Sequence, residues 1–238
     1  ATDGGGGMCD YGGATLTNVT FSANTAYSGG GMYTGSNATL TNVTFSANTA
    51  HSGGGMYINY NSSATLTNVT FSANTAIFGG GMYYSGNATL TDIIFSANAA
   101  GDGGGMYIDY YSSATLTDVT FSANTAVSGG GMYINEHSSA TLTNVTFSGN
   151  TTEYYGGGIY IGYYSSAMLT NVTFSGNTAK EYYGGGMYNS GNATLTDITF
   201  SANTAGIGGG MYTGSNATLT NVTFSANTAE QGGGMYIV

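Results

Sequence analysis

Charge is nearly absent from this chain. Its 238 residues include one Lys, no Arg and eleven acids, so that 5% of residues are charged and the formal net charge is −10. A nucleic-acid-binding protein needs Lys and Arg to neutralise phosphates, and one cation is too few. A coiled coil needs charged side chains along its seam, and these are missing as well. The composition therefore excludes both classes.

Proline and tryptophan are absent, and Cys9 is the only cysteine. Collagen is excluded because its triple helix needs proline and a glycine at every third residue. One cysteine allows no disulfide within the chain. No run of 18 apolar residues occurs, so we expect no membrane-spanning helix and no integral membrane protein. With 41% hydrophobic residues, the chain is also unlike a disordered one.

What the sequence does contain is a repeat, the feature to seek first. Gly-Gly-Gly followed by Met or Ile occurs ten times at spacings of 24 to 28 residues. The block Ala-Thr-Leu-Thr-Asn-Val-Thr-Phe-Ser-Ala-Asn-Thr-Ala, first seen at residues 14–26, occurs nine times between these motifs with few changes. We therefore expect about nine coils and the start of a tenth, in one domain covering residues 1–238.

Each repeat has the alternation of β-strands. In Thr15-Leu16-Thr17 an apolar residue lies between two hydroxyls, which is typical of a strand with one face in a core. Glycine runs and β-branched residues both disfavour a helix. Coils of 24 to 28 residues with three strand segments predict an all-β fold, a right-handed parallel β-helix, because left-handed β-helices usually have shorter coils. Met32 and its equivalents should point inward and Tyr33 and its equivalents outward.

Length differences occur in two places. One follows the Gly-Gly-Gly-Met-Tyr motif and has four residues at 34–37 but six at 58–63. The other precedes the glycines and has two residues at 27–28 but four at 180–183. Strands that stack on neighbours cannot change length, whereas corners that face solvent can. The pattern therefore predicts two variable corners in each coil.

Stacking of equivalent residues predicts columns along the rod. Leu, Val or Ile, and Phe should form the interior, as at Leu16, Val19 and Phe21. An Asn follows each Phe by three residues, and an amide can donate and accept on both sides. We expect these residues to form a structural ladder: Asn24, Asn48, Asn74, Asn98, Asn124, Asn150, Asn177, Asn203 and Asn227.

Tyrosine dominates the candidate contact residues. It follows the Met or Ile in nine repeats, with Cys9 in its place in the first, and predicts an aromatic stripe: Tyr33, Tyr57, Tyr83, Tyr107, Tyr133, Tyr160, Tyr188, Tyr212 and Tyr236. The stripe could stabilise the sheet or bind a partner, and the sequence leaves both open. The variable corners should form a ridge for lateral or ligand contact: Tyr60, Tyr110, Tyr111, Glu136, His137, Tyr154, Tyr155, Tyr163, Tyr164, Tyr182 and Tyr183.

Nine Phe-x-x-Asn tetrads, such as residues 21–24 and 147–150, alternate with glycine-rich motifs such as residues 29–32. This pattern resembles the repeats of chlamydial polymorphic outer-membrane proteins and related bacterial surface repeats, in which GGAI-like motifs alternate with FxxN. The resemblance covers nearly the whole chain. It implies a β-helical passenger that is displayed at the cell surface and serves adhesion rather than catalysis.

Catalytic and metal-binding patterns are missing from the sequence. The eleven acids are scattered, and no inserted loop builds a cleft around Asp92 and Asp118, which should lie about 5 Å apart on adjacent coils. The calcium nonapeptide repeat is absent because Met-Tyr follows the glycines. We therefore expect no enzyme, no catalytic residues, no metal site and no cofactor.

Three functions are compatible with these features. The first is a non-enzymatic extracellular structural protein that stacks head to tail on itself into a surface or matrix filament, since the first and last coils carry the common motifs and no caps are evident. The second is an adhesin passenger fragment that binds glycan or a surface protein through the Tyr-rich corners. A lesser third is ice binding by stacked Thr-x-Thr rows, as at residues 15–17, which Met168 interrupts. Low charge and abundant Thr, Ser and Asn suit an extracellular or cell-surface location.

Overall fold

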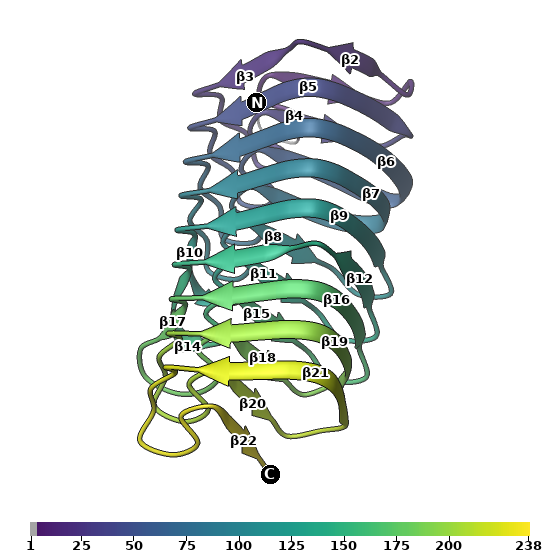
Figure 1. The fold of residues 1–238 in the computed structure, drawn as a ribbon. Helices are drawn as coiled ribbons and strands as arrows, with labels where there is room; N and C mark the ends of the chain where they lie inside the picture. Colours follow the sequence, from purple (N-terminus) through teal and green to yellow (C-terminus); the bar gives the residue numbers. More distant parts are fainter. Residues whose placement is uncertain (1–3) are drawn as a thin grey trace.

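The computed structural model describes residues 4–238, which form a parallel β-solenoid with one end of the chain at each end of the stack (Figure 1). The chain winds through nine coils and enters a tenth. We number the coils from their glycine motifs, so that coil 1 opens at Gly5, coil 7 at Gly156, coil 8 at Gly184 and coil 9 at Gly208. Paired strands in residues 4–238 are parallel. The all-β solenoid predicted from the repeat is confirmed.

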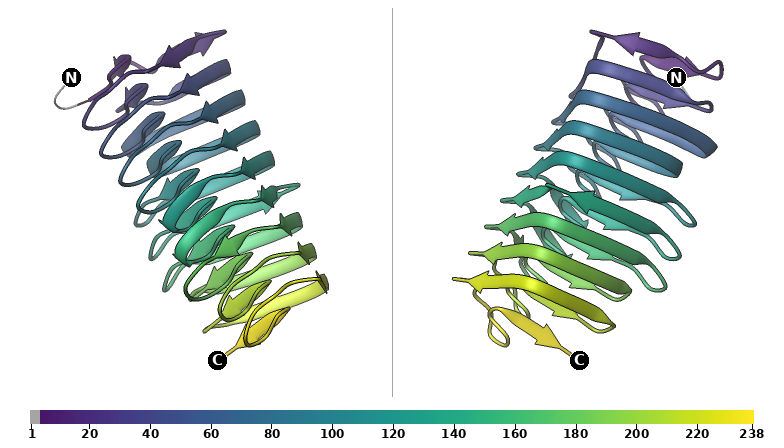
Figure 2. Two further views of the ribbon diagram at one scale, coloured as in Figure 1. Left: turned by 90° about the vertical axis from the view of Figure 1, so that its left-hand side faces the viewer. Right: turned by 45° about the vertical axis from the view of Figure 1, so that its right-hand side comes forward.

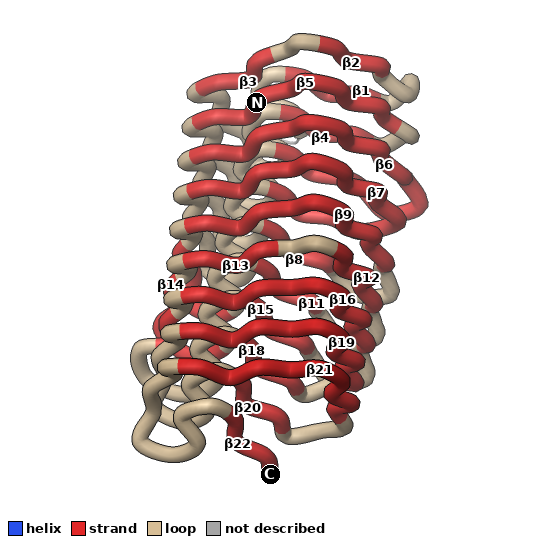
Figure 3. The backbone as a smooth tube through the Cα atoms, viewed as in Figure 1, coloured by secondary structure: helices blue, strands red, loops and turns tan. Residues whose placement is uncertain are grey.

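Each coil has up to three strand positions, separated by corners (Figure 3). The first position holds β1 (Met8–Asp10), β4 (Met32–Thr34), β8 (Met106–Ile108), β11 (Met132–Ile134), β15 (Ile159–Ile161), β18 (Met187–Asn189), β20 (Met211–Thr213) and β22 (Met235–Ile237). The second holds β2 (Thr15–Thr17), β3 (Thr20–Ser22), β5 (Ala38–Ser46), β9 (Ser113–Ser122), β12 (Ser139–Thr143), β13 (Thr146–Ser148), β16 (Ser166–Ser175), β19 (Asn192–Ser201) and β21 (Ala217–Ser225). The third holds β10 (Thr125–Ser128), β14 (Thr151–Tyr155) and β17 (Thr178–Ala179). In coils 3 and 4 the first two positions form one long strand, β6 (Met56–Ser72) and β7 (Met82–Ser96).

Neighbouring coils pair equivalent residues. Met8 lies beside Met32, Leu40 beside Leu66, and Phe174 beside Phe200. Shifts in register occur at the variable corners, for example between Ile58 and Ser62. The strands therefore stack as an even series of rungs, and only the corners differ in outline from coil to coil (Figure 2).

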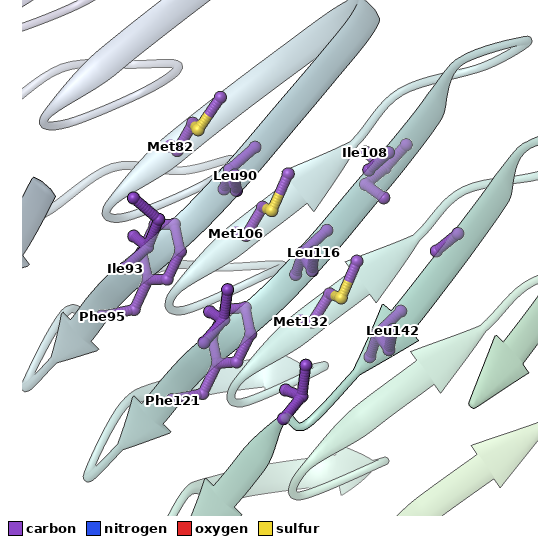
Figure 4. Close-up of a cluster of buried hydrophobic side chains, with 14 of the residues drawn as sticks. Met82, Leu90, Ile93, Phe95, Met106, Ile108, Leu116, Phe121, Met132 and Leu142 are labelled. Atoms are coloured by element: carbon purple, nitrogen blue, oxygen red, sulfur yellow. The ribbon is translucent and has the colours of Figure 1, made fainter. Parts of the chain in front are cut away.

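The interior consists of columns of identical apolar side chains (Figure 4). Met106, Leu116, Val119 and Phe121 represent four of these columns, and each is at most 1% exposed. Adjacent rings in the Phe column stack with centroids 4.7 to 5.0 Å apart and planes within 9° of parallel. Each coil thus completes the core of the next, as expected for a solenoid.

Two bends in each coil have left-handed backbone conformation. The first bend follows Thr-x-Thr and uses Asn or Asp, with φ between 53° and 57°. These residues tolerate the left-handed region because their short side chains bond locally. The second bend follows Phe-Ser and uses Ala in most coils, with φ between 53° and 55°, but Gly149 and Gly176 in coils 6 and 7. The second bend leads directly into the Asn ladder.

The glycine motif marks the closest approach between coils. A Cβ added to Gly131 would lie 2.6 Å from the Gly158 carbonyl oxygen and 2.7 Å from Cδ1 of Phe147. The equivalent glycines of the other inner coils meet the same obstruction. The run of glycines is therefore required by packing against the neighbouring backbone.

Candidate interaction surface

The nine Asn residues predicted to form a ladder lie in one hydrogen-bonded column. In its centre, Asn124 Nδ2 donates to the Phe95 carbonyl and to Asn150 Oδ1, both at 2.9 Å. Asn124 Oδ1 accepts hydrogen bonds from the backbone N–H and the Nδ2 of Asn98, both at 3.0 Å. The seven Asn residues from Asn48 to Asn203 are 0% exposed. All donors and acceptors of Asn124 are thus occupied, and the column holds the bend together rather than presenting amides to a ligand.

A second amide row, not predicted from the sequence, lies at the first bend. Asn42 Nδ2 donates to Asn18 Oδ1 at 3.1 Å, and Asn171 Nδ2 donates to Asn144 Oδ1 at 2.8 Å. This row is exposed, and Asp92 and Asp118 occupy adjacent positions in it. The available signal was an Asn or Asp at this position in every coil. The two acids therefore lie on an exposed bend and not in a cleft.

The tyrosine stripe is a continuous stack of nine buried or half-buried rings on the outer side of the first strand position. Adjacent rings have centroids 4.4 to 5.7 Å apart and planes within 11° of parallel. Burial raises the pKa of the Tyr160 hydroxyl to about 12, and it raises the pKa of Tyr133 further. Because each ring covers the face of the next, a ligand would meet only edges and hydroxyls along most of the stripe.

The residues predicted as one ridge lie on two separate corners. Their separation follows from the two insertion points, which sit at opposite ends of the first strand position. We call the set after this position the first-corner ridge: Tyr60, Tyr110, Tyr111, Glu136, His137, Tyr163 and Tyr164. The set before the glycines is the second-corner ridge: Tyr154, Tyr155, Tyr182 and Tyr183. The tyrosine stripe runs between the two ridges.

A stack of three rings forms the centre of the first-corner ridge. The centroid of His137 lies 5.2 Å from that of Tyr111 and 5.0 Å from that of Tyr164, with planes within 13° of parallel. All three residues have left-handed backbone, with φ from 56° to 59°. Bulky residues seldom adopt this conformation. Tyr164 is also 77% exposed, so core packing does not explain its presence there.

The second-corner ridge is continuous with the tyrosine stripe. Ring centroids of Tyr155 and Tyr188 lie 5.1 Å apart, and those of Tyr183 and Tyr212 lie 4.6 Å apart. The neighbouring Glu153 carboxylate raises the pKa of the Tyr154 hydroxyl. Coils 6 to 9 therefore carry a broad aromatic surface at this corner.

Two hollows lie where the long corners of coil 7 give way to shorter ones. The first, of about 270 Å³, is lined by Tyr163, Tyr164, Ser190, Gly191, Asn192, Gly214 and Ser215. The second, of about 350 Å³, is lined by Lys180, Glu181, Tyr182, Tyr183, Gly206, Ile207 and Glu230. Each hollow spans coils 7, 8 and 9 at one of the two variable corners. Differences in corner length thus create the concave parts of this surface.

The Thr-x-Thr rows form two files on the second strand position. Thr89 pairs with Thr115 and Thr91 with Thr117, and equivalent pairs continue along the rod. Thr89 and Thr115 are exposed. Met168, which is 58% exposed, interrupts one file. The files are regular on both sides of this position.

Residues 4–238 hold neither a metal-binding cluster nor a membrane-spanning helix. No three His, Cys, Asp or Glu side chains in this part of the chain are arranged to hold a metal ion. The same residues contain no helix long and apolar enough to cross a membrane.

Comparison with known families identifies the fold. The family model described as right handed beta helix region matches residues 3–153 and 104–238, which together cover nearly the whole chain. No curated protein and no solved structure matches the sequence.

Proposed function

We propose that this chain, which belongs to the right-handed β-helix family, is a non-enzymatic rod that acts outside the cell as an adhesin. The resemblance of its Phe-x-x-Asn and glycine motifs to chlamydial and related surface repeats supports display at a cell surface. A rod of stacked coils can hold its corners far from its point of attachment, since each coil adds about 4.8 Å. Contact with glycan or protein would then occur at the corners.

The first-corner ridge carries this proposal. Tyr60, Tyr111 and Tyr164 are 64%, 75% and 77% exposed, although coils 2, 8 and 9 place only Thr, Ser, Gly and Asn at these corners. Exposed aromatic clusters with a polar rim are typical of interaction sites. The fold does not need these side chains, because coils with short corners close equally well. A role in contact accounts for them.

The placement of titratable groups supports a non-enzymatic role. General acid–base catalysis requires an acid or base held within reach of a bound substrate. Asp92 and Asp118 lie on an exposed bend outside both hollows, and the His137 ring is packed between two tyrosines. The first hollow has no charged lining residue, and the charged residues at the second hollow, Lys180, Glu181 and Glu230, are exposed.

A binding assay with a ridge variant tests the adhesin proposal. Tyr111, His137 and Tyr164 are replaced together by Asn, the residue that coil 3 uses at the same left-handed position, Asn61. We expect the native protein to bind immobilised matrix proteins or printed glycans, and the triple variant to bind at least tenfold more weakly with unchanged thermal stability. Tyr27→Val is the matched control, because it removes a 55% exposed ring outside both ridges. Equal binding by the triple variant, or no binding by the native protein, would overturn the proposal.

End-to-end stacking into a filament is the second candidate. The observation that favours it is the uniform register, in which every coil presents a Leu and a Phe, and every coil but coil 7 a Met, in the same columns to its neighbour. Any coil is therefore a template for a coil of another copy. We expect sedimentation velocity to show association that grows with concentration, and electron microscopy to show rods of variable length. A stable monomer at high concentration would contradict stacking.

Ice binding remains a third candidate because of the threonine files. Regular files of exposed hydroxyls on a parallel sheet are suited to ordering water. Met168→Thr would complete the interrupted file, and we expect it to raise thermal hysteresis above that of the native protein. Absence of hysteresis from both proteins would remove this candidate.

A further inference from the structure

The first hollow is the product of a step in corner length. Residues 161–166 of coil 7 form a corner two residues longer than that of residues 189–192 in coil 8, where Ser166 pairs with Asn192. Tyr163 and Tyr164 belong to the longer corner and therefore have neighbours in coil 6 but no counterpart in coil 8. Tyr163 and Tyr164 form one wall of the hollow, and the shorter corners of coils 8 and 9 form its floor.

Tyr164 has one ring face covered and the other uncovered. His137 stacks against the side toward coil 6, with planes 10° from parallel. Within residues 4–238 no other ring stacks on Tyr164, and the hollow lies on its remaining side. The stripe tyrosines of the inner coils have a stacked ring on both faces, as Tyr133 does between Tyr107 and Tyr160. Tyr164 thus offers a planar apolar face beside a concave space.

The floor of this hollow is polar and uncharged. Ser190, Asn192 and Ser215 contribute hydroxyl and amide groups, and Gly191 and Gly214 contribute backbone without side chains. Within the described residues, the Asn192 side chain accepts one long hydrogen bond, of 3.5 Å from Asn216 Nδ2, and makes no donation. A phosphate or carboxylate ligand would find no cation here, and a cation would find no acid. A neutral ligand with one apolar face and several hydroxyls matches the lining.

We propose that this hollow binds one neutral sugar residue of a glycan, with the apolar face of its ring against Tyr164 and its hydroxyls toward Ser190, Asn192 and Ser215. The inference rests on the adhesin function proposed above and names the ligand class for one part of the ridge. The volume of about 270 Å³ is slightly below that of pockets for drug-sized ligands, roughly 300–1,000 Å³, and so suits a single ring. The hollow is open, which lets the remaining sugars of a chain extend over coils 8 and 9.

Backbone strain at Tyr164 also supports a binding role for this residue. Its φ is 59°, and a bulky side chain in this backbone region lowers the stability of the fold. The fold does not require Tyr here, because Asn61 occupies the equivalent position of coil 3. This equivalence also provides the test variant. Tyr164→Asn removes the ring while introducing a residue that favours the left-handed conformation, so the coil should remain folded.

The test is binding to a printed array of neutral hexose and N-acetylhexosamine oligosaccharides beside sialylated and sulfated ones. The neutral oligosaccharide that gives the strongest binding signal is then titrated into the protein by calorimetry. We expect neutral glycans to bind the native protein, Tyr164→Asn to weaken the affinity at least tenfold, and Tyr27→Val to change it less than twofold. Unchanged thermal melting of Tyr164→Asn shows that the loss is local.

The outcomes separate this inference from the adhesin function. Retained affinity in Tyr164→Asn, with loss in Tyr111→Asn, would move the site to the other end of the three-ring stack and overturn this assignment only. Binding of acidic glycans alone, or of matrix protein without any glycan, would overturn the neutral sugar and leave the adhesin function standing. A native protein that binds no glycan and no matrix protein would overturn both.

Discussion

Gly131 and Gly149 show that glycine is required for different physical reasons at different positions of a coil. Gly131 lies in the glycine motif, where a Cβ would be 2.6 Å from the Gly158 carbonyl oxygen. Gly149 lies at the second bend, where an added Cβ would meet nothing within 4 Å and only the φ of 61° is at issue. Other coils place Ala at that bend, for example Ala123. One position is limited by space and the other by backbone conformation.

Alanine substitution should separate these two limits. We expect Gly131→Ala to lower the free energy of unfolding by about 3 kcal/mol, because backbone and a stacked Phe ring must move. Gly149→Ala should cost no more than about 1 kcal/mol, since the left-handed penalty is partly offset by a less flexible unfolded chain. Urea unfolding followed by circular dichroism measures both values. Equal losses would show that the close approach at the glycine motif is not limiting.

The two amide rows provide a second comparison at the scale of residues. Asn124→Asp places a carboxylate where two donors are required, and leaves the Phe95 carbonyl and Asn150 Oδ1 without their hydrogen bonds. We expect a loss of several kcal/mol at pH 7. Burial raises the pKa of a carboxyl group, so the neutral form is favoured in the fold and part of the stability should return near pH 4.

Asn42→Asp is the matched control for this substitution. Residue 42 lies in the exposed row between Asn18 and Asn68, so the new carboxylate has no acidic neighbour, and coils 4, 5 and 8 already carry Asp in this row. We expect a change below about 1 kcal/mol in the urea-derived free energy of unfolding. A similar loss in both variants would mean that burial of the ladder does not determine its contribution.

The tyrosine stripe acts as an element of its own and should make the protein sensitive to alkali. Burial raises the pKa values of Tyr33 and Tyr160 to about 12, against about 10 in the unfolded chain. Between these values the unfolded chain loses protons that the fold retains, so the free energy of unfolding falls as the pH rises. The fall approaches about 1.4 kcal/mol per pH unit for each such tyrosine.

This expectation is tested by urea unfolding at pH values from 8.5 to 11.5, a range that spans roughly the ordinary tyrosine pKa of 10. Stability should be constant up to about pH 9.5 and then decline steeply. Absorbance at 295 nm reports tyrosinate in the same samples. Full ionisation of the tyrosines near pH 10 without loss of stability would contradict the stripe as a packed element.

The repeat predicts the elements well because their causes are periodic. Spacing of the glycine motif defined the coils, and alternation of Leu16 and Phe21 with hydroxyls defined the inward columns. The insertion points divide the ridge residues between two corners, but the paths of these corners are not periodic. The sequence therefore did not reveal that the two corners lie on either side of the tyrosine stripe, and a single ridge was predicted. Nor did it reveal the free face of Tyr164, which depends on the length of the corner in the next coil.

At the scale of the whole molecule, one coil is the smallest segment that we expect can be removed without disrupting the fold. Removing residues 79–102 deletes one complete coil of 24 residues and joins Phe78 to Gly103 without disturbing the order of motifs. We expect a folded, soluble protein with an unchanged circular dichroism spectrum. The denaturant dependence of its unfolding should fall by about a tenth, because that dependence follows the surface exposed.

A shorter deletion serves as the control. Removing residues 91–102 leaves half a coil and brings a glycine motif opposite a threonine strand. We expect this variant to be insoluble or unfolded in the same assays. A folded half-coil variant, or an unfolded whole-coil variant, would contradict the description of the molecule as a sum of equivalent coils.

Uniform register has a cost during folding. Because the Leu and Phe columns are the same at every interface and the Met column differs only at Ile159, a coil that docks one place too far along the rod finds nearly the same partners as it would in the native position. The core distinguishes native from slipped pairings only weakly. The unequal corners can, since a six-residue corner set against a four-residue one leaves loops that do not match their new neighbours. The corners thus help to specify which coils pair during folding, in addition to any role in binding a partner.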